Sequence, residues 1–262
     1  MKSLNGQALA DFIKERQFHQ VANLKTKPNL LIIYDHDDPV ILKYISLKMN
    51  YGKDIGVIVE KFRAKTPAEI AEKIRSANLD PKISSIILQL PLSDKTKTDE
   101  LTNLIAPEKD VEGLSKHSHF DSATATAILW LLTGYDIDLK TKKIALVGHG
   151  KLVGAPLYRM LKASDLPVEL FYRGSDLTKL KQYDTIITAT GVPGLISDSL
   201  VAPGTYLIDA GTAVENGRLV GDIADEIYAR TDLAAITPRL GGVGPLTIAC
   251  LFDHVIQAAH QN

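Results

Sequence analysis

Short apolar segments alternate with amphipathic segments along nearly the whole chain, and this alternation restricts the fold more than any other feature. Strands that alternate with helical patterns favour a mostly parallel sheet with helices on both faces. A length of 262 residues suits one large domain or two small ones. The segments predicted as strands are residues 30–34, 56–60, 85–90, 143–147, 168–172, 185–188, 206–209 and 235–237.

Capping signals mark the ends of several predicted helices. Thr66 and Glu69 form a capping-box pattern, with proline at the first helical position. Gly134 is expected to end a helix over residues 122–132. The last helix, residues 246–261, has apolar side chains at a period of 3.6, which predicts a face directed at a core.

The stretch of residues 106–121 is polar and irregular, and it separates two series of strand–helix units. We therefore predict an α/β protein of two α/β domains with a cleft between them. The first domain covers residues 1–118 and is joined by the final helix, residues 245–262. The second covers residues 119–244 and is a Rossmann-like dinucleotide-binding domain, because it contains a glycine-rich turn after a strand.

Composition argues against several classes of protein. Lys and Arg number 30 against 31 Asp and Glu, so net charge gives no sign of nucleic-acid binding. A single cysteine, Cys250, excludes an intrachain disulfide and a cysteine-rich metal site. No apolar run approaches the ~18 residues that span a bilayer. We expect a cytoplasmic protein without a metal, and a solvated loop around His117 and His119.

The clearest local motif is the glycine-rich turn that begins at Gly148, His149 and Gly150 and ends at Gly154. It follows a predicted strand and opens a predicted helix. Glycines at such a turn let backbone N–H groups approach a pyrophosphate at the helix N-terminus. The spacing, GxGxxxG, is one residue longer than the usual fingerprint, and a strand–helix turn without a ligand would have the same pattern.

The end of the next strand indicates which dinucleotide binds. NAD sites usually place an acid there for the ribose hydroxyl groups. This chain has Arg173, which suits a 2′-phosphate, and the nearby acid, Glu169, lies inside the strand. NADP is therefore favoured over NAD, although a solvated surface arginine is the alternative interpretation.

Lys48 is the candidate general base. Ile41, Tyr44 and Ile45 form an apolar stripe on a helix that begins near Pro39, and Lys48 continues this stripe. A lysine turned toward a core or cleft loses its proton more easily, which suits proton abstraction. The alternative is a lysine whose stem packs while its ammonium group reaches water.

Two further segments favour a ligand. Gln89 ends an apolar strand, and ligands in parallel sheets bind beyond the carboxyl ends of strands. A glutamine paired only with backbone groups is the alternative. Residues 241–247 form a second glycine-rich turn ahead of a helix, which is either a binding turn or a structural turn with a helix cap.

Taken together, these segments resemble the bifunctional methylenetetrahydrofolate dehydrogenase/methenyltetrahydrofolate cyclohydrolase family over residues 30–259. The order and spacing of the matching stretches make the resemblance specific. They are Pro39…Tyr44-Ile-Ser-Leu-Lys48, Gln89-Leu-Pro-Leu92, Ala106-Pro-Glu-Lys-Asp-Val-Glu-Gly113, Gly148…Val153-Gly154-Ala-Pro156, Thr190-Gly-Val-Pro-Gly-Leu-Ile196, Ile208-Asp-Ala-Gly-Thr212 and Thr237-Pro-Arg-Leu-Gly-Gly-Val-Gly-Pro-Leu-Thr247.

The resemblance implies roles for particular residues. Lys48 matches the family's catalytic lysine, Tyr44 its active-site tyrosine and Gln89 the glutamine that partners the lysine. The implied folate-binding residues, besides Tyr44, are Leu90, Glu112, Gly242, Gly244, Pro245 and Thr247. The implied cofactor-binding residues are Gly148, His149, Gly150, Arg173 and Thr212.

The sequence departs from the family pattern at several of these stretches. Glu112 stands where the family has a folate-binding aspartate, and Ile41 where it has a serine. Ser122-Ala-Thr-Ala125 replaces Pro-Cys-Thr-Pro, His149-Gly150 replaces a common Arg-Ser, and Leu240 replaces a usual proline.

The resemblance implies NADP-dependent oxidation of 5,10-methylenetetrahydrofolate to 5,10-methenyltetrahydrofolate, and hydrolysis of that product to 10-formyltetrahydrofolate. These reactions belong to one-carbon metabolism and supply purine biosynthesis. It also implies a homodimer that binds tetrahydrofolate derivatives and neither nucleic acid nor a membrane. Two alternatives are another two-domain NADP oxidoreductase, of the shikimate type, and a non-catalytic family member that binds folate or nucleotide.

Overall fold

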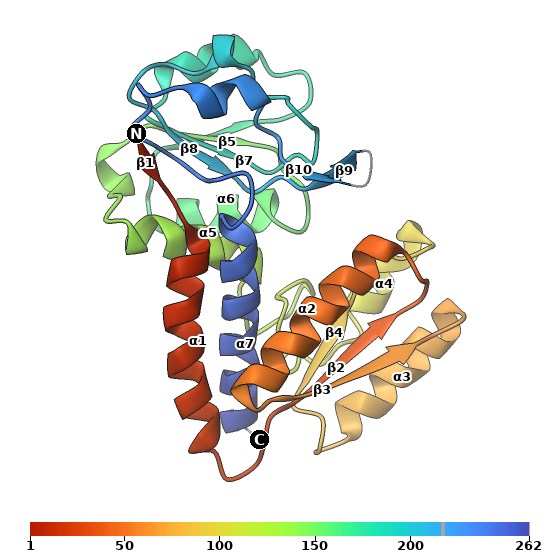
Figure 1. Ribbon diagram of the computed structural model, residues 1–262. Coiled ribbons are helices and arrows are strands. Elements are labelled where there is room, and N and C mark those ends of the chain that lie inside the picture. Colours follow the sequence, from red (N-terminus) through yellow and green to blue (C-terminus); the bar gives the residue numbers. More distant parts are fainter. Residues whose placement is uncertain (216–217, 262) are drawn as a thin grey trace. The chain divides into compact units, whose positions relative to one another are not determined.

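The computed structural model describes residues 1–215 and 218–261, and the chain divides into two compact units. The large-sheet unit consists of Met1–Ala10 and Thr124–Thr247. The small-sheet unit consists of Asp11–Ala123 and the chain from Ile248 onward. Helices α1 (Gly6–Ala22) and α7 (Val243–Gln261) each begin in the large-sheet unit and continue into the small-sheet unit (Figure 1).

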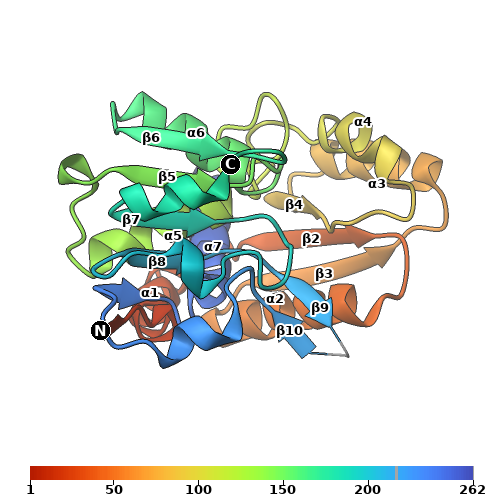
Figure 2. The same cartoon turned by 90° about the horizontal axis from the view of Figure 1, so that it is seen from above.

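The large-sheet unit is built on a parallel sheet with the strand order β1-β11-β8-β7-β5-β6. Figure 2 shows β6, β5, β7 and β8 side by side in this order. Its central strands are buried along their whole length, as expected for a parallel sheet covered on both faces. The strands are β1 (Lys2–Ser3), β5 (Ile144–Val147), β6 (Val168–Phe171), β7 (Thr185–Thr188), β8 (Tyr206–Asp209) and β11 (Ala235–Ile236).

Helices and short turns complete the large-sheet unit. The helices are α5 (Ala123–Gly134) and α6 (Gly154–Ala163), and a hairpin joins β9 (Ala213–Glu215) to β10 (Arg218–Val220). Short 3-10 helices lie at Leu139–Thr141, Leu177–Gln182, Asp198–Leu200 and Asp225–Ala229. The predicted parallel sheet with alternating helices is confirmed, whereas β1, β9 and β10 were not predicted, because strands of two or three residues have no readable apolar pattern.

The small-sheet unit has a parallel sheet with the order β3-β2-β4. Leu31 and Ile33 of β2 pack with Ile70 and Ile74 of α3 on one face. Because side chains alternate along a strand, Leu30 and the other residues of opposite parity point to the other face of the sheet. The elements are β2 (Asn29–Tyr34), α2 (Pro39–Ile55), β3 (Ile58–Arg63), α3 (Pro67–Leu79), β4 (Ser85–Leu88), the 3-10 turn Lys95–Lys97 and α4 (Thr98–Thr102).

The capping predictions are confirmed with one change. The Thr66 hydroxyl group accepts the backbone N–H of Glu69, as a helix N-cap does. The Glu69 carboxylate, however, accepts the N–H of Lys65, one residue earlier than a capping box places it. Helix α7 begins at Val243, three residues before the predicted start.

The sequence predicted that Gly134 ends a helix over residues 122–132. In the structure, α5 extends to Gly134, which is its last residue. The left-handed residue that follows is Asp136, with φ 56°. A Cβ atom at Gly134 would lie 2.7 Å from the Leu9 side chain. The glycine is therefore explained by the close approach of Leu9 rather than by a left-handed cap.

The two units do not follow the expected domain boundaries everywhere. Residues 1–10 were expected in the first domain, but β1 pairs with β11, so they belong to the large-sheet unit. The chain passes between units after Ala123 rather than after residue 118, and it passes back inside α7, after Thr247. A continuous helix gives no sequence signal at such a crossing, because its apolar stripe runs on without a break.

Candidate functional site

Lys48 lies at the centre of a polar cluster in the small-sheet unit. It belongs to the buried stripe of α2, with Ile41 and Ile45, and only 7% of the residue is exposed. Its Nζ atom lies 2.9 Å from Gln89 Oε1 and 2.9 Å from Glu112 Oε1. The structure therefore brings together three residues that the sequence analysis singled out, and it places the lysine head group among protein partners.

Gln89 is held so that its oxygen faces Lys48. Its backbone N–H donates to the carbonyl of Ile33 and extends the ladder of β4 with β2. Its side-chain Nε2 donates to the carbonyl of Leu90 at 3.0 Å, which leaves Oε1 as the acceptor for Lys48. The residue follows β4 at its carboxyl end, where the sequence analysis expected a ligand.

Glu112 sits in a turn whose flanks are anchored on both sides. The buried Lys109 donates to the carbonyls of Ala77 and Asp80 at the end of α3, each at 2.9 Å, and burial lowers the pKa of Lys109. On the other side, a Cβ atom at Gly113 would lie 2.4 Å from the backbone of Asp121. Gly113 also has φ +69°, so the turn requires glycine there.

Tyr44 lies one helical turn before Lys48 on α2, and its residue is half-buried. Ile41, one turn earlier again, is 3% exposed and packs in the core. At this position, where the resemblance implies a serine, the chain therefore has a residue that contributes apolar packing. Tyr44, Lys48, Gln89, Leu90 and Glu112 all belong to the small-sheet unit.

The glycine-rich turn lies in the large-sheet unit, where β5 ends and α6 begins. Gly148 has φ +104°, and a Cβ atom at Gly154 would lie 2.2 Å from the Gly148 carbonyl oxygen, so both positions require glycine. Gly150 is exposed, and a Cβ atom there would meet nothing within 4 Å. His149 is exposed beside it, and its ring packs edge-on against Tyr158. Open backbone at the start of a helix fits a dinucleotide pyrophosphate.

Arg173 lies in the turn after β6, next to the glycine-rich turn, because Val147 of β5 is paired with Phe171 of β6. The turn is closed by Ser175, whose Oγ accepts the N–H of Tyr172 at 3.0 Å. Arg173 is exposed, while Glu169 accepts a hydrogen bond from the Tyr183 hydroxyl group. The acid nearest to the strand end therefore has a protein partner, and the arginine is accessible to a ligand.

Two carboxylates that were not predicted, the half-buried Asp209 and the buried Asp222, shape the turns after β7 and β8. Asp209 accepts the N–H groups of Gly211, Asp222 and Ile223 at 2.9–3.2 Å. Asp222, with no exposed surface, accepts the Thr188 hydroxyl group at 2.5 Å and the N–H of Thr190 at 2.6 Å.

The environment of Asp209 changes its acidity. Burial, with the charge of Asp222 as a further contribution, raises the pKa of Asp209 to about 6. Thr212, an expected cofactor-binding residue, directly follows Gly211 and is exposed. A glycine at position 211 is required because a Cβ atom would lie 2.1 Å from the Asp222 carboxylate. The glycine at position 211, which leaves room for the Asp222 carboxylate, is the sequence signal that could have indicated this arrangement.

The second glycine-rich turn also lies in the large-sheet unit. Gly241 has φ +83°, and a Cβ atom at Gly242 would lie 3.1 Å from Thr237. Gly244, Pro245 and Thr247 follow in the first turns of α7. The sequence analysis joined residues 245–247 to the first domain, whereas the structure groups them with the large-sheet unit.

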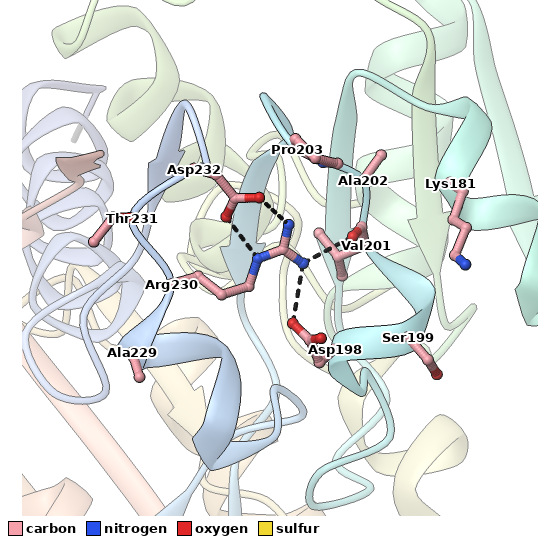
Figure 3. Close-up of a pocket in the computed structure, with 10 residues that line it drawn as sticks. All are labelled: Lys181, Asp198, Ser199, Val201, Ala202, Pro203, Ala229, Arg230, Thr231 and Asp232. Atoms are coloured by element: carbon pink, nitrogen blue, oxygen red, sulfur yellow. Dashed lines mark hydrogen bonds and ion pairs between the residues drawn. The ribbon is translucent and has the colours of Figure 1, made fainter.

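A shallow pocket of about 610 Å³ surrounds Arg230 in the large-sheet unit (Figure 3). The guanidinium group donates to Asp232, Asp198 and the carbonyl of Val201, so its donors are directed at protein acceptors. The predicted site residues are absent from the lining of this pocket. We therefore do not assign a ligand to it.

Two negative findings apply to residues 1–215 and 218–261. Among these residues, no helix is long and apolar enough to cross a membrane. The same residues contain no grouping of three or more His, Cys, Asp or Glu side chains that would hold a metal ion. His117 and His119 thus belong to no such grouping within the described chain.

Comparison with known proteins covers both units. A family model described as the catalytic domain of tetrahydrofolate dehydrogenase/cyclohydrolase matches residues 4–112. A second model, described as the NAD(P)-binding domain of tetrahydrofolate dehydrogenase/cyclohydrolase, matches residues 122–262.

Individual proteins match over the full length. The bifunctional protein FolD of Limosilactobacillus reuteri (strain DSM 20016) is 36% identical over 98% of this chain and 96% of its own. The crystal structure of the bifunctional dehydrogenase/cyclohydrolase FolD from Campylobacter jejuni has a TM-score of 0.93 at 30% identity and covers 100% of this chain and 99% of its own. FolD from Trypanosoma brucei, complexed with NADP and an inhibitor, has a TM-score of 0.91 at 25% identity, with 99% and 97% covered.

Proposed function

This chain belongs to the tetrahydrofolate dehydrogenase/cyclohydrolase family, and we propose that it is a bifunctional enzyme that prefers NADP. It oxidises 5,10-methylenetetrahydrofolate to 5,10-methenyltetrahydrofolate and hydrolyses this product to 10-formyltetrahydrofolate. We assign folate binding and catalysis to the cluster in the small-sheet unit. We assign cofactor binding to the glycine-rich turn of the large-sheet unit.

The single observation that carries the proposal is the burial of Lys48 between Gln89 and Glu112. A lysine head group is rarely placed in a protein interior unless it is paired or has a chemical task. Here the pairing partners are the two residues that match the family's own site positions. The cluster thus contains an amine for water activation and a carboxylate for pterin binding.

Hydrolysis of the methenyl cation requires removal of a proton from the attacking water. An ammonium group has no lone pair, so Lys48 must first release its proton to the solvent. The free amine then accepts a proton from water as the water oxygen bonds to the methenyl carbon, and this proton passes to N5 of folate as the bond between N5 and that carbon breaks. We propose that Glu112 turns to the N–H groups of the pterin ring when folate binds. Lys48 then faces the cationic substrate without its carboxylate partner. Gln89 keeps the amine in place.

Hydride transfer makes a different demand on the protein. A bound nicotinamide accepts a hydride from the methylene carbon, and the folate nitrogens stabilise the developing cation. Gly150 would present its backbone N–H to the pyrophosphate, and His149 and Thr212 would flank the cofactor. Gly148, whose N–H donates to the Phe171 carbonyl, would contribute the left-handed turn that brings the chain close to the cofactor. The remaining task of the protein is orientation of folate against the cofactor.

Support for NADP over NAD comes from the end of β6. The exposed Arg173 suits a 2′-phosphate, and Glu169, which would suit ribose hydroxyl groups, is bonded to Tyr183. We also propose a cytoplasmic homodimer that supplies purine biosynthesis and needs no metal. Support for the dimer is the family resemblance and the position of β3, which pairs with β2 alone in the described sheet.

The two alternatives differ in what they leave unexplained. A shikimate-type oxidoreductase accounts for the glycine-rich turn but not for the catalytic-domain match over residues 4–112. A non-catalytic member accounts for the departures at Ile41 and Glu112 but leaves the buried lysine without a task. Folate binding without turnover would favour the second alternative.

The deciding experiment follows methenyltetrahydrofolate and reduced cofactor by absorbance in the same cuvette. Methylenetetrahydrofolate is supplied with NADP in one series and with NAD in another, and shikimate replaces folate in a control series. We expect reduced cofactor to accumulate faster with NADP, and the methenyl signal to decay by hydrolysis. Absence of turnover with folate would contradict the proposal, and turnover with shikimate would favour the first alternative.

A further inference from the structure

His254 is a buried histidine on α7 that lies outside the residues assigned so far. Only 7% of the residue is exposed, and its Nδ1 atom lies 2.9 Å from the carbonyl oxygen of Val111. Its ring is stacked on Phe120, with the ring centroids 4.9 Å apart and the planes inclined by 28°. All of these residues belong to the small-sheet unit. The ring is therefore fixed by a hydrogen bond at its edge and an aromatic contact on its face.

The hydrogen bond determines which nitrogen of the ring carries the proton. A carbonyl oxygen only accepts, so Nδ1 must be the donor. Burial lowers the pKa of His254, so the ring is neutral at physiological pH and has a single N–H group. That one donor is committed to Val111.

The bond acts on the peptide unit that joins Val111 to Glu112. The Val111 carbonyl and the Glu112 N–H lie in one rigid plane, so fixing the carbonyl fixes the plane from which the Glu112 side chain starts. Val111 has no exposed surface, and water therefore does not replace a lost donor without a local opening of the structure. Without His254, this plane would lose its hydrogen bond at the position next to Glu112.

The other anchors of the turn act elsewhere. Lys109 holds the turn to the end of α3, and the Asp110 carboxylate accepts the N–H groups of Leu114 and Ser115. The Lys109 carbonyl accepts the N–H of Ile86. These contacts fix the two flanks of the turn, and the His254 contact acts on the peptide bond directly before Glu112.

We propose that His254 is a positioning residue for folate binding: its Nδ1–H group orients the Val111–Glu112 peptide so that the Glu112 carboxylate points at Lys48 and, in turn, at the pterin ring. This inference rests on the proposed function of Glu112. It predicts that His254 affects the KM for folate without touching substrate. It also predicts that NADP binding, in the other unit, does not depend on His254.

Three variants test the inference. His254→Leu removes the donor, His254→Asn keeps an N–H donor on the same side-chain carbon that bears Nδ1, and His260→Leu is a control at an exposed position of the same helix. A buried carbonyl without a donor corresponds to roughly a tenfold effect on an equilibrium. We expect His254→Leu to raise the KM for methylenetetrahydrofolate about tenfold. The KM for NADP should stay unchanged, and His254→Asn should restore most of the folate KM.

A double-mutant cycle separates positioning from general damage. In a Glu112→Gln background, loss of the His254 donor should have little further effect on the folate KM, because the group that it positions is already impaired. A structural defect would instead add its full loss to that of Glu112→Gln. Full additivity, or an unchanged folate KM in His254→Leu, would overturn the inference.

The test also covers two other results: a His254→Leu variant that does not fold, and a wild-type chain that does not use folate. If His254→Leu fails to fold by circular dichroism, His254→Gln takes its place, since it moves the donor one bond farther out. The inference then requires that His254→Asn keeps the folate KM and His254→Gln does not. A wild-type chain that neither binds nor turns over folate would overturn the proposed function and this inference together, whereas wild-type turnover with an unchanged KM in the variants overturns the inference alone.

Discussion

The Lys48 ammonium nitrogen lies 2.9 Å from the Glu112 carboxylate, although the two residues are 64 positions apart in the chain. The side chains are 9% and 20% exposed, so water screens this pair less than it screens a surface salt bridge. Glutamate at this position reaches one methylene farther than the aspartate of the family pattern. The pair therefore links the residue proposed for water activation directly to the residue proposed for pterin recognition.

Replacing Lys48 with methionine should separate the two activities. Methionine keeps a similar length but accepts no proton, so we expect methenyl hydrolysis to fall by at least ~100-fold, the lower end of general-base contributions. Dehydrogenase activity should fall less, through poorer placement of folate. Methenyl decay and cofactor reduction are measured on the same purified variant, after circular dichroism has established folding.

The matched control for that experiment is Lys43→Met, on the exposed face of the same helix. It makes the same chemical change outside the cluster and should leave both activities unchanged. Near-normal hydrolysis in Lys48→Met would reject Lys48 as the base. An equal loss of both activities would instead assign it to folate positioning.

Glu112→Gln should weaken folate binding and leave NADP binding unchanged. An amide retains one acceptor oxygen but loses the negative charge that strengthens hydrogen bonds from the pterin N–H groups. Calorimetric titration with folate and with NADP measures both affinities. Unchanged folate affinity would remove Glu112 from the site. Glu112→Asp is informative in the other direction, because tighter binding would show that the longer side chain is a compromise with the contact to Lys48.

Arg173→Ala should reduce the preference for NADP. Loss of a charge-assisted contact with the 2′-phosphate is expected to cost about 1.5–3 kcal/mol in the NADP complex alone. The measurement is kcat/KM with NADP and with NAD, for wild type and variant. Lys179→Ala, at another exposed basic position of the same unit, serves as the control for a general loss of positive charge. The assignment of Arg173 fails if the NADP/NAD ratio does not change.

Asp209 should make stability depend on pH between about 4 and 6. Burial raises the pKa of Asp209 from its ordinary value of 3.8 to about 6 in the folded protein, so the native state retains a proton that the unfolded state has released. This contribution is present at low pH and is lost as pH rises through that window, to a total of roughly 3 kcal/mol. Urea unfolding of wild type and Asp209→Asn at a series of pH values measures the effect.

The informative quantity for Asp209→Asn is how its free energy of unfolding changes with pH, not its absolute value. Asparagine offers one acceptor to the three N–H groups that Asp209 satisfies, so the variant is expected to be less stable at every pH. The difference between the two proteins should nevertheless shrink as pH rises from 4 to 6. Parallel pH profiles would show that Asp209 does not titrate in this range.

The sequence predicts correctly those elements that are marked by patterns of neighbouring residues. The apolar run of β2 and the proline at the start of α2 are local patterns, and both lie where they were predicted. Lys48 was found because helical spacing put it on an apolar face. Its role as a neighbour of Glu112, by contrast, follows from the family resemblance and from the fold, since no local pattern connects the two.

Other features required the three-dimensional structure. His254 continues the apolar stripe of α7, three residues after Leu251, yet a helical period does not reveal that its Nδ1 meets Val111. Asp209 and Asp222 became visible as a pair only when β8 and the turn after β10 were placed together. The crossing between units inside α7 has no sequence signal, because a helix keeps its period whichever unit it packs against.

The passage of α7 into the small-sheet unit has a consequence for synthesis on the ribosome. Gln17 donates to the carbonyl of Ala249, and Tyr51 stacks on Phe252, so helices synthesised early contact residues synthesised much later. While translation proceeds through the intervening large-sheet residues, the nascent small-sheet unit exposes the apolar surface that α7 later covers. The contacts of α7 in this unit therefore form only after translation has passed Ile248, so the small-sheet unit is completed after the residues of the large-sheet unit have been synthesised.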